Sequence, residues 1–357
     1  MKLLIAMSGG VDSSVVAYLM NQMGHECVGC MMKLHPDQPI DLAAEHNCCT
    51  TNDVADAEAV ASQLEMPFHV INFADDFYEK IILPFIAAYE RGVTPNPCVD
   101  CNRFMKFDKL YAQALALGCS HVVTGHYAQI EYRDGKYLLK KATDPSKDQS
   151  YVLYSLTQEQ LSRTLFPLGH MSKAETRALA EKSGFANANK PDSQDICFVP
   201  DGDYARVIST YTGKTYPKGQ FVSTDGTVLG EHKGIIHYTI GQRKGLGLAL
   251  KCPHYVCRIC PESNTVVLGT DDEVYESHLR ASAFHWISGE TPSLPVRCKA
   301  KIRYRQPEQW ATATVVGDGV VSVVFDEPQR AITPGQAVVL YDGDIVLGGG
   351  VIERYDI

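Results

Sequence analysis

The feature that most constrains the fold is a short stretch near the start of the chain, where an apolar run meets two glycines and a helical pattern. Residues 3–7 have the composition of a buried strand, Ser8-Gly9-Gly10 follows as a turn, and residues 11–23 carry apolar side chains at helical spacing. The N-terminus of a helix offers unpaired N–H groups, and glycines let the backbone close around an anion. The sequence therefore predicts a phosphate-binding loop between a strand and a helix.

This loop lacks the lysine of the Walker-type loop, GxxxxGK[ST], which contacts the β- and γ-phosphates of a nucleotide. Lys2 precedes the strand and lies on the wrong side of it. Backbone N–H groups alone can hold a pyrophosphate that leaves as a unit when the α-phosphate is attacked. The missing lysine therefore indicates adenylation, and the order SGGVDSS resembles the loop of the ATP pyrophosphatases. The alternative interpretation is an ordinary strand-to-helix turn.

Strand and helix patterns continue to alternate through the first half of the chain. Strands are predicted at residues 27–34, 68–71 and 121–124, and helices at 54–64, 77–89, 110–117, 158–165 and 173–182, with a hairpin around Asp134-Gly135. This order is typical of an α/β fold with a parallel sheet and helices on both faces. Ligands of such sheets bind beyond the carboxyl ends of the strands.

The pattern changes from about Tyr204 onward, where short apolar runs are separated by Gly-rich turns. That pattern predicts a small β-rich region followed by a β-barrel. We therefore expect three domains: a catalytic domain over residues 1–204, a central β-rich domain over 205–277 and a C-terminal β-barrel over 278–357.

Composition limits the partners and the location. The chain of 357 residues has a formal net charge of −9; residues 1–205 carry 17 basic and 26 acidic side chains, and the remainder carries 16 of each. A polyanion would have to be bound by local basic patches. No stretch approaches the roughly 18 to 20 apolar residues of a membrane span, and no signal sequence precedes Ser8. We expect a cytoplasmic protein without a membrane partner, whose 12 cysteines are mostly reduced.

Three cysteines stand in sequence contexts that suggest chemistry. Cys98 and Cys101 form a CxxC in TPNPCVDCNRFMKF, where two prolines stiffen the approach, and Cys197 lies in the polar stretch DSQDICFVPDGDY. A CxxC alone is compatible with thioredoxin-like redox chemistry, half a zinc site or a packed loop. The other cysteines, including the second CxxC of Cys257 and Cys260 and the pair Cys48-Cys49, are interpreted as core or loop residues.

A series of long motifs in this order resembles one family, the tRNA-uridine 2-sulfurtransferases, also called tRNA-specific 2-thiouridylases. The motifs are SGGVDSS, TPNPCVDCN, TGHYA at 124–128, KDQSYVLY at 147–154, SQDICFVP at 193–200, IGQRKGLG at 240–247 and TPGQ at 333–336. The resemblance implies that ATP adenylates the C2 oxygen of a wobble uridine in tRNA, releasing pyrophosphate, and that sulfur then displaces AMP.

The resemblance also implies roles for individual residues. Cys197 would carry a persulfide received from a sulfur-relay protein or a cysteine desulfurase, and Cys101 would free that sulfur and form a transient disulfide with Cys197. ATP would be bound, with Mg²⁺ placed near Asp12, by Ala6, Met7, Ser8, Gly9, Gly10, Val11, Asp12, Ser13, Met32 and Gly125. The target base and the rest of the tRNA, which the central domain would also contact, would be bound by Asn96, Pro97, Cys98, His126, Lys147, Asp148, Gln149, Arg303, Tyr304 and Gln336.

The sequence departs from the family pattern at Cys98, where some members carry an Asp that is a candidate acid/base group. Asp100 lies two residues on and is expected to project elsewhere. Cys98, Cys101 and Cys197 could instead ligate an iron–sulfur cluster, because soft thiolates suit such clusters.

The segment RCKAKIRYR, residues 297–305, carries alternating basic residues that would share one face of a strand. A solvated strand face is one interpretation, and a row of phosphate contacts, extended by Arg243 and Lys244, is the other. Two further functions stay open from the residues alone: an amide-forming ATP pyrophosphatase that needs no thiols, and a non-catalytic nucleotide-binding module that releases no pyrophosphate.

Overall fold

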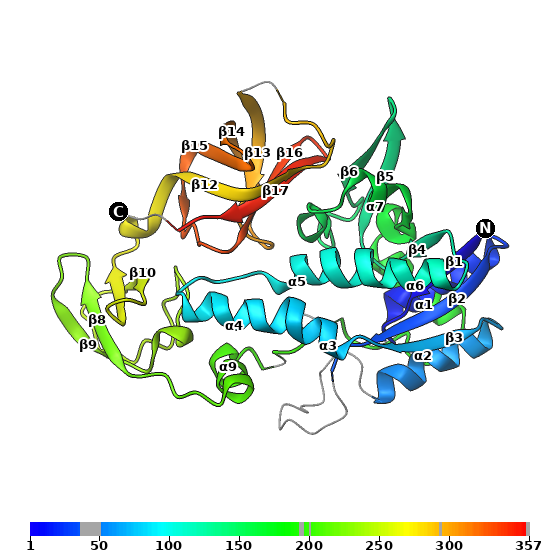
Figure 1. Cartoon of the computed structure of the whole chain (residues 1–357), viewed down its shortest axis with the longest axis horizontal. Helices are drawn as coiled ribbons and strands as arrows, with labels where there is room; N and C mark the ends of the chain where they lie inside the picture. Colours follow the sequence, from blue (N-terminus) through cyan, green and yellow to red (C-terminus); the bar gives the residue numbers. More distant parts are fainter. Residues whose placement is uncertain (36–50, 193–195, 200, 293–294, 355–357) are drawn as a thin grey trace.

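The structure, a computed structural model, describes the chain except for residues 36–50, 193–195, 200, 293–294 and 355–357. Its first domain contains the expected parallel sheet (Figure 1). The five strands run in the order β3 (Phe68–Asn72), β2 (Glu26–Lys33), β1 (Lys2–Ala6), β4 (His121–Val123) and β7 (Thr164–Leu165). Cys48-Cys49 and part of the SQDICFVP motif lie outside the described residues.

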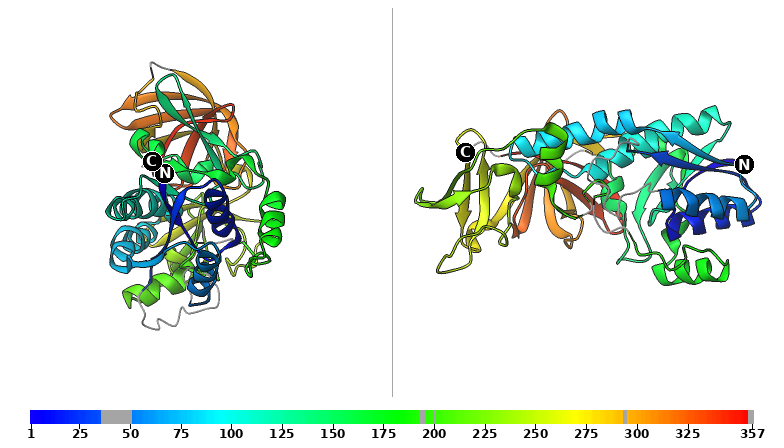
Figure 2. Two further views of the ribbon diagram at one scale, coloured as in Figure 1. Left: turned by 90° about the vertical axis from the view of Figure 1, so that its right-hand side faces the viewer. Right: turned by 90° about the horizontal axis from the view of Figure 1, so that it is seen from below.

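Strand β1 is buried on both faces because its apolar residues are consecutive. Leu3 and Ile5 point to one face and Leu4 to the other, since successive side chains of a strand alternate. The face with Leu3 and Ile5 is covered by α1 (Val11–Gln22), α2 (Thr51–Gln63) and α8 (Lys173–Lys182). Two long helical segments cover the other face, and Figure 2 shows helices on both sides of the sheet.

The first of these segments is continuous from residue 74 to residue 90 and comprises α3 (Ala74–Phe77), the π-helix η1 (Tyr78–Ile82) and α4 (Leu83–Glu90). The second comprises α5 (Pro97–Asp100), the π-helix η2 (Cys101–Lys109) and α6 (Leu110–Ala116). The sequence analysis began this helix only at residue 110, which is wrong, because the helical segment starts at Pro97 and includes the CxxC. Asn96 caps the helix by accepting from the Cys98 N–H at 3.2 Å, and Pro97 occupies its first position. Both are ordinary helix-start signals that were present in the sequence.

Two further expectations concern the hairpin and the helix that follows it. The predicted hairpin is confirmed as β5 (Ala128–Arg133) and β6 (Lys136–Lys141), and Asp134 and Gly135 both have positive φ, as its two-residue turn requires. The predicted helix over 158–165 is shorter: α7 (Gln158–Ser162) ends early, and β7 follows it as the fifth parallel strand. The 3₁₀ turns η3 (Ser150–Leu153) and η4 (Pro167–His170) complete this region.

The central region begins with a helix, α9 (Tyr204–Thr212), which the sequence analysis did not predict. A four-stranded sheet follows in the order β10 (Tyr255–Cys260), β11 (Thr265–Gly269), β8 (Gly219–Ser223) and β9 (Val228–His232), with the 3₁₀ turns η5 (Ile235–His237) and η6 (Asp272–Val274). A bulge in β10 buries Val256 and Ile259 and leaves Cys257 and Cys260 half-buried. The sequence analysis expected Cys257 and Cys260 to be core residues, and this expectation is wrong because both are only half-buried.

The C-terminal region is the expected β-barrel. Its strands run in the order β12 (Tyr275–Trp286), β15 (Val320–Arg330), β14 (Gln309–Gly317), β13 (Val296–Lys301), β16 (Ala337–Asp342) and β17 (Ile345–Ile352), and a β12–β17 pairing closes the ring. Strand β6 of the first domain pairs with β17 through Lys140 and Ile345, so the hairpin joins the barrel to the first domain. Across the described ranges, no helix is long and apolar enough to span a membrane.

Candidate active site

The predicted phosphate-binding loop lies at the carboxyl edge of the parallel sheet. Strands β1, β2 and β4 end at Ala6, Lys33 and Val123, so Met7, Met32 and Gly125 stand near this edge. Gly9 has φ +73°, and a Cβ there would lie 2.4 Å from the backbone oxygen of Asp53. Only glycine fits this position, because both the positive φ and the close backbone exclude a side chain.

The loop curls back on the first turn of α1 through its serines. The Ser8 N–H donates to Ser13 Oγ at 3.2 Å, and the hydroxyls of Ser13 and Ser14 donate to the Gly10 carbonyl at 3.0 and 3.1 Å. Gly10 is the N-cap, and no side chain of the described residues caps this helix. The first N–H groups of α1 therefore face the loop, as an anion site requires.

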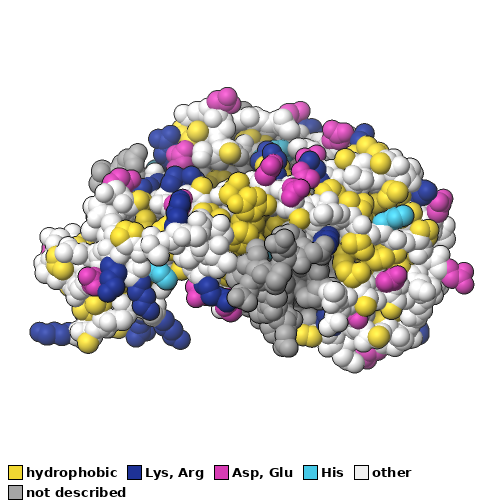
Figure 3. Space-filling view, turned by 60° about the horizontal axis from the view of Figure 1, so that its bottom comes forward, with side chains coloured by type: hydrophobic (Ala, Val, Ile, Leu, Met, Phe, Trp, Pro, Cys, Tyr) yellow, Lys and Arg dark blue, Asp and Glu magenta, His cyan; other side chains and the backbone are white. Residues whose placement is uncertain are grey.

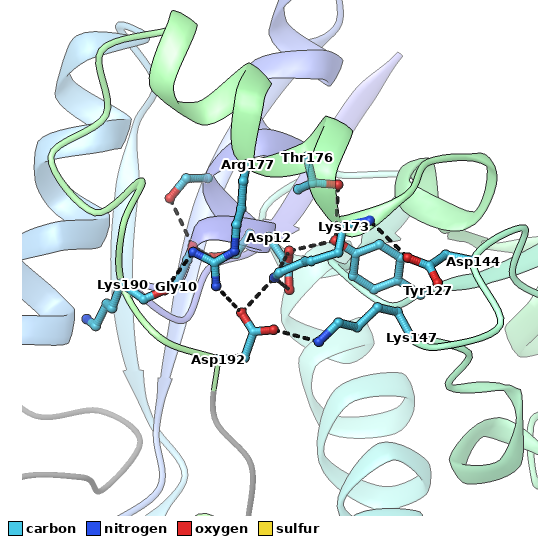
Figure 4. Close-up of polar contacts among 12 residues, drawn as sticks. Gly10, Asp12, Tyr127, Asp144, Lys147, Lys173, Thr176, Arg177, Lys190 and Asp192 are labelled. Atoms are coloured by element: carbon cyan, nitrogen blue, oxygen red, sulfur yellow. Dashed lines mark hydrogen bonds and ion pairs between the residues drawn. The ribbon is translucent and has the colours of Figure 1, made fainter. Parts of the chain in front are cut away.

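A lysine does reach this loop, but it comes from another helix. Lys173 in α8 donates from Nζ to both carboxylate oxygens of Asp12, at 2.7 and 2.9 Å (Figure 4). Arg177 lies one turn further along the same helix. The sequence analysis missed both residues. The only local signal was their four-residue spacing in the first two turns of a helix that begins with the Ser172–Glu175 capping box.

The carboxylate of Asp192 forms ion pairs with three positive side chains beside Asp12. Its carboxylate accepts from Lys147 at 2.9 Å, and it lies 2.8 Å from both Lys173 and Arg177 (Figure 4). Burial opposes ionisation of Asp192, but hydrogen bonds from Lys147 and Lys173 outweigh it and lower its pKa to about 2. Lys147, which the resemblance assigned to tRNA, is thus engaged within the protein beside the loop.

The back of the loop is held by a second set of contacts. Asn187 donates to the Gly9 carbonyl at 3.0 Å and to Ser14 Oγ at 2.9 Å. Lys190 also donates to the Gly9 carbonyl and forms ion pairs with Asp53 and Asp56 at 2.6 and 2.7 Å. The segment that follows α8 therefore fixes the shape of the loop, although it lies more than 170 residues away in the chain.

The TGHYA motif connects the loop to the CxxC helix. A Cβ on Gly125 would lie 3.1 Å from Asp12 Cβ and 3.3 Å from the Ser13 nitrogen, so this glycine allows close packing on α1. The Tyr127 hydroxyl donates to Asp12 at 2.8 Å. Lys106 of η2 lies 3.4 Å from His126 Nε2. The motif therefore contacts the start of α1 through Gly125 and Tyr127, and the CxxC helix through His126, which lies between them.

His126 is a neutral hydrogen-bonding group. Burial, and to a lesser degree the charge of Lys106, holds its pKa well below the usual range. Because an ammonium can only donate, Nε2 accepts from Lys106, and Nδ1–H donates to Thr124 Oγ1 at 2.7 Å. The contact of His126 with a base stays a prediction.

The three cysteines differ in exposure. Cys98 is exposed in the first turn of the helix, and Cys101 is half-buried one turn later on the same side. Cys197 is also half-buried, and it packs against the same hydrophobic cluster as Cys101. Within the described ranges, no group of three or more His, Cys, Asp or Glu side chains is arranged to hold a metal ion. Burial raises the pKa of Asp100 to about 6, against the opposing charge of Arg103.

The barrel contributes to the same site through its TPGQ motif. Gln336 donates from Nε2 to the carbonyls of Thr94 and Pro95, at 2.9 and 3.2 Å, and the Thr94 N–H donates to the Pro334 carbonyl at 3.0 Å. These bonds fix the chain just before the Asn96 cap. Burial raises the pKa of Tyr304, and negative charge on Asp148 and then on Cys98 adds to this effect, so Tyr304 of the barrel lies near Cys98.

The expected row of basic residues on one strand is wrong beyond Lys301, where β13 ends. Arg303 is half-buried and donates to the carbonyls of Ile240 and Ala331 and to Thr333, so it joins the central region to the barrel. Arg297 and Lys299 are ion-paired with the acidic residues Asp326 and Glu308.

The two residues after Lys147 have structural partners as well. Asp148 accepts from the N–H groups of Ala142 and Ser150 and from the Ser150 hydroxyl, and Gln149 accepts from the Tyr127 N–H at 3.0 Å. Their contacts with tRNA stay predictions.

A different surface offers unpaired positive charge. Lys and Arg side chains gather at the end of the molecule formed by the central sheet (Figure 3). In residues 213–277, the exposed Lys and Arg side chains for which the described part of the chain provides no ion pair are Lys233, Arg243, Lys244, Lys251 and Arg258. This set, the central basic surface, meets the requirement for a local polyanion-binding patch.

Comparisons with known proteins agree with this architecture. Residues 1–201 match a family model described as a tRNA methyl transferase HUP domain, residues 205–270 match a tRNA methyl transferase PRC-barrel domain, and residues 276–352 match an aminomethyltransferase beta-barrel domain. A solved 4-thiouridine synthetase–RNA complex with bound ATP is 16% identical with a TM-score of 0.36, over 56% of this chain and 45% of that one, which is too distant to carry an argument about the site.

Full-length relatives are much closer. The chain is 50% identical over 355 residues to the tRNA-specific 2-thiouridylase MnmA of Clostridioides difficile, covering 99% of this chain and 98% of the relative. The protein of the same name from Acetivibrio thermocellus is also 50% identical, covering 99% of each chain. With such identity over the whole length and a family model that spans more than half of the residues, the chain belongs to the tRNA-specific 2-thiouridylase family.

Proposed function

We propose that this chain is a tRNA-uridine 2-sulfurtransferase that thiolates C2 of a wobble uridine at the cost of ATP. The observation that carries the proposal is the direct connection between two chemically different parts. A lysine-free anion loop packs on Gly125, and the adjoining His126 contacts the helix that bears Cys98 and Cys101. The candidate adenylation loop and the candidate thiols therefore belong to one structural unit, which supports the proposal, and relatives of full length are named tRNA-specific 2-thiouridylase.

In the proposed first step, the C2 oxygen of the uridine attacks the α-phosphate of ATP, and pyrophosphate leaves. The residues proposed to bind ATP are Ala6, Met7, Ser8, Gly9, Gly10, Val11, Asp12, Ser13, Met32 and Gly125. The α1 N–H groups and the neighbouring cations match the charge of the leaving pyrophosphate. Mg²⁺ would supply further charge neutralisation on the phosphates. Asp12 is its candidate protein ligand, but Lys173 already binds both of the Asp12 oxygens, so the ion would compete with that ammonium.

In the second step, the terminal sulfur of a persulfide on Cys197 bonds to C2 as AMP leaves. The Cys101 thiolate then attacks the remaining Cys197 sulfur and breaks its bond to the transferred sulfur, which stays on the base. The resulting Cys101–Cys197 disulfide is reduced by an external thiol, which supplies two electrons. The position of both cysteines against one hydrophobic cluster supports this pairing. The persulfide sulfur would come from a sulfur-relay protein or a cysteine desulfurase.

An iron–sulfur cluster on Cys98, Cys101 and Cys197 is the alternative for this step. The described residues do not bring these thiols together as a metal-binding group, so no step is derived through a cluster. Activity and iron content of Cys98→Ser, purified without oxygen, separate the two mechanisms. The persulfide pair predicts substantial thiolation without iron, whereas an iron-containing wild type and an inactive, iron-free variant would favour the cluster.

We propose that tRNA is bound by the central basic surface and by the residues around Cys98. The candidates near the base are Asn96, Pro97, Cys98, His126 and the exposed Tyr304, whose ring could stack on an extruded base. Nucleoside mass spectrometry of tRNA from cells with and without this protein tests the function. Loss of 2-thiouridine derivatives without the protein is the expected result, and an unchanged 2-thiouridine content would contradict it.

A further inference from the structure

Beside the phosphate loop, three cations converge on a single carboxylate. Lys147 comes from the segment after β6, whereas Lys173 and Arg177 both project from α8 (Figure 4). Their nitrogen atoms lie 2.8–2.9 Å from the oxygens of Asp192. Asp12 and Asp144 also lie beside these cations; the Asp144 carboxylate accepts from the Lys173 N–H at 3.1 Å and interacts electrostatically with Lys147. Three positive side chains therefore face three carboxylates, and displacing Asp192 leaves an excess of positive charge next to the N-terminus of α1, which itself favours anions.

These cations are held in place and remain reachable from solvent. The Arg177 guanidinium also donates to the carbonyls of Ala188 and Lys190, at 3.4 and 3.2 Å, which fixes its orientation. The exposed fractions of the side chains are 12% for Lys173, 32% for Arg177 and 36% for Lys147. Partial burial strengthens their interaction with an anion, and the residual exposure lets a phosphate approach.

We propose that Lys147, Lys173 and Arg177 form the subsite for the β- and γ-phosphates of ATP, which leave as pyrophosphate, and that Asp192 is a competing carboxylate that these phosphates displace. The inference rests on the proposed use of ATP. In this subsite, the positive charge that the lysine of a Walker-type loop supplies comes from Lys173 and Arg177 of α8 and from Lys147. Pyrophosphate carries several negative charges and more acceptor oxygens than one carboxylate, so it satisfies the three cations better than Asp192 does.

A purely structural role for this cluster makes the opposite prediction. If Asp192 only holds Lys147, Lys173 and Arg177 in place, its removal leaves like charges close together and weakens the site. If Asp192 competes with phosphate, its removal strengthens phosphate binding. The sign of the change in affinity therefore distinguishes the two roles.

The test is calorimetric titration of inorganic pyrophosphate and of ATP, with MgCl₂ present, into the full-length chain. Asp192→Asn is expected to bind both ligands several-fold more tightly than wild type. Arg177→Gln is expected to bind them roughly tenfold more weakly, because a hydrogen bond to a charged group contributes about that much. Asp326→Asn is the matched control: it removes the same charge and also breaks an arginine ion pair, but in the barrel. It should bind like wild type.

The outcomes separate the inference from the proposed function. If wild type binds ATP or pyrophosphate and Asp192→Asn binds them equally well or more weakly, the inference is overturned. The proposed use of ATP is then unaffected. Unchanged binding by Arg177→Gln also overturns the inference and leaves the use of ATP intact. Binding of neither ligand by wild type overturns the use of ATP and the subsite with it. If Asp192→Asn does not fold, Lys147→Gln replaces it; several-fold weaker binding is then expected, and unchanged binding overturns the inference.

Discussion

Single cysteines in this chain differ in reactivity because their surroundings differ. Burial, with a smaller effect of the neighbouring Cys119, raises the pKa of Cys30 to about 12, and burial raises that of Cys298 to about 11. Below these values the thiols stay protonated, and only thiolates react as nucleophiles. Cys98 and Cys252 are exposed instead. The sulfur chemistry of this chain is therefore restricted to a few positions by burial alone.

This difference predicts the order of alkylation by iodoacetamide at pH 8. Cys252 should be labelled well before Cys30 and Cys298, which stay protonated and shielded in the folded chain. Peptide mass spectrometry after timed quenching measures the order, and urea-unfolded protein, in which all sites should react alike, is the control. Labelling of Cys30 as fast as Cys252 in the folded chain would refute this account.

At the scale of elements, the strand, the glycine turn and helix α1 were predicted correctly because their signals are local. The start of the CxxC helix was equally local, in Asn96 and Pro97, and was overlooked. Lys173 could not be assigned to the loop from sequence, since its contact with Asp12 joins residues 161 positions apart. The basic strand was extended too far because alternation of side chains does not reveal where a strand ends. Arg303 therefore seemed exposed, although tertiary contacts bury it.

The phosphate loop provides a prediction about glycine. Gly9→Ala should weaken ATP binding at least tenfold, because a Cβ would lie 2.4 Å from the Asp53 backbone and force the loop to move. Gly118→Ala is the matched control: its φ of +74° is nearly the same, but no atom lies within 4 Å of its Cβ. It should lower the free energy of unfolding by about 1 kcal/mol, the cost of a left-handed residue, and leave ATP affinity unchanged. Equal ATP affinities of the two variants would argue against the predicted loop.

At the scale of the whole molecule, the barrel supports the site from outside the α/β domain. Its Gln336 holds the two carbonyls before the Asn96 cap, and Arg303 ties it to the central region. The fold class and the order of the three regions were predictable from sequence. Which barrel residues would touch the CxxC helix was not, because that contact depends on how the domains pack.

Removing the hydrogen bonds of Gln336 to the Thr94 and Pro95 carbonyls should affect thiolation more than nucleotide binding. Gln336→Leu leaves two partly buried carbonyls without a donor, at a cost of about 1–3 kcal/mol each, and loosens the chain before Cys98. We expect the thiolation rate to fall several-fold while ATP affinity stays unchanged. Gln329→Leu, which loses only a local bond to Glu327, is the control. An unaffected thiolation rate in Gln336→Leu would show that Gln336 does not position the CxxC helix.

Binding of tRNA should depend on the central basic surface. Replacing Arg243 and Lys244 with Ala is expected to weaken binding and to reduce the slope of log K against log salt by about one for each lost phosphate contact. Arg297→Ala, which removes a charge already paired with Asp326, should change the slope less. Filter binding at several salt concentrations measures the slopes. Equal slopes for the double variant and wild type would exclude this surface.

The central claim is that one site couples adenylation to sulfur transfer. Its most direct test incubates the purified chain with unmodified tRNA, labelled ATP and a persulfide donor, and quantifies nucleotide products together with 2-thiouridine. The account predicts AMP and pyrophosphate in amounts that match the 2-thiouridine formed, and no 2-thiouridine with Cys101→Ser. Formation of ADP and phosphate, or thiolation that proceeds without AMP release, would contradict it.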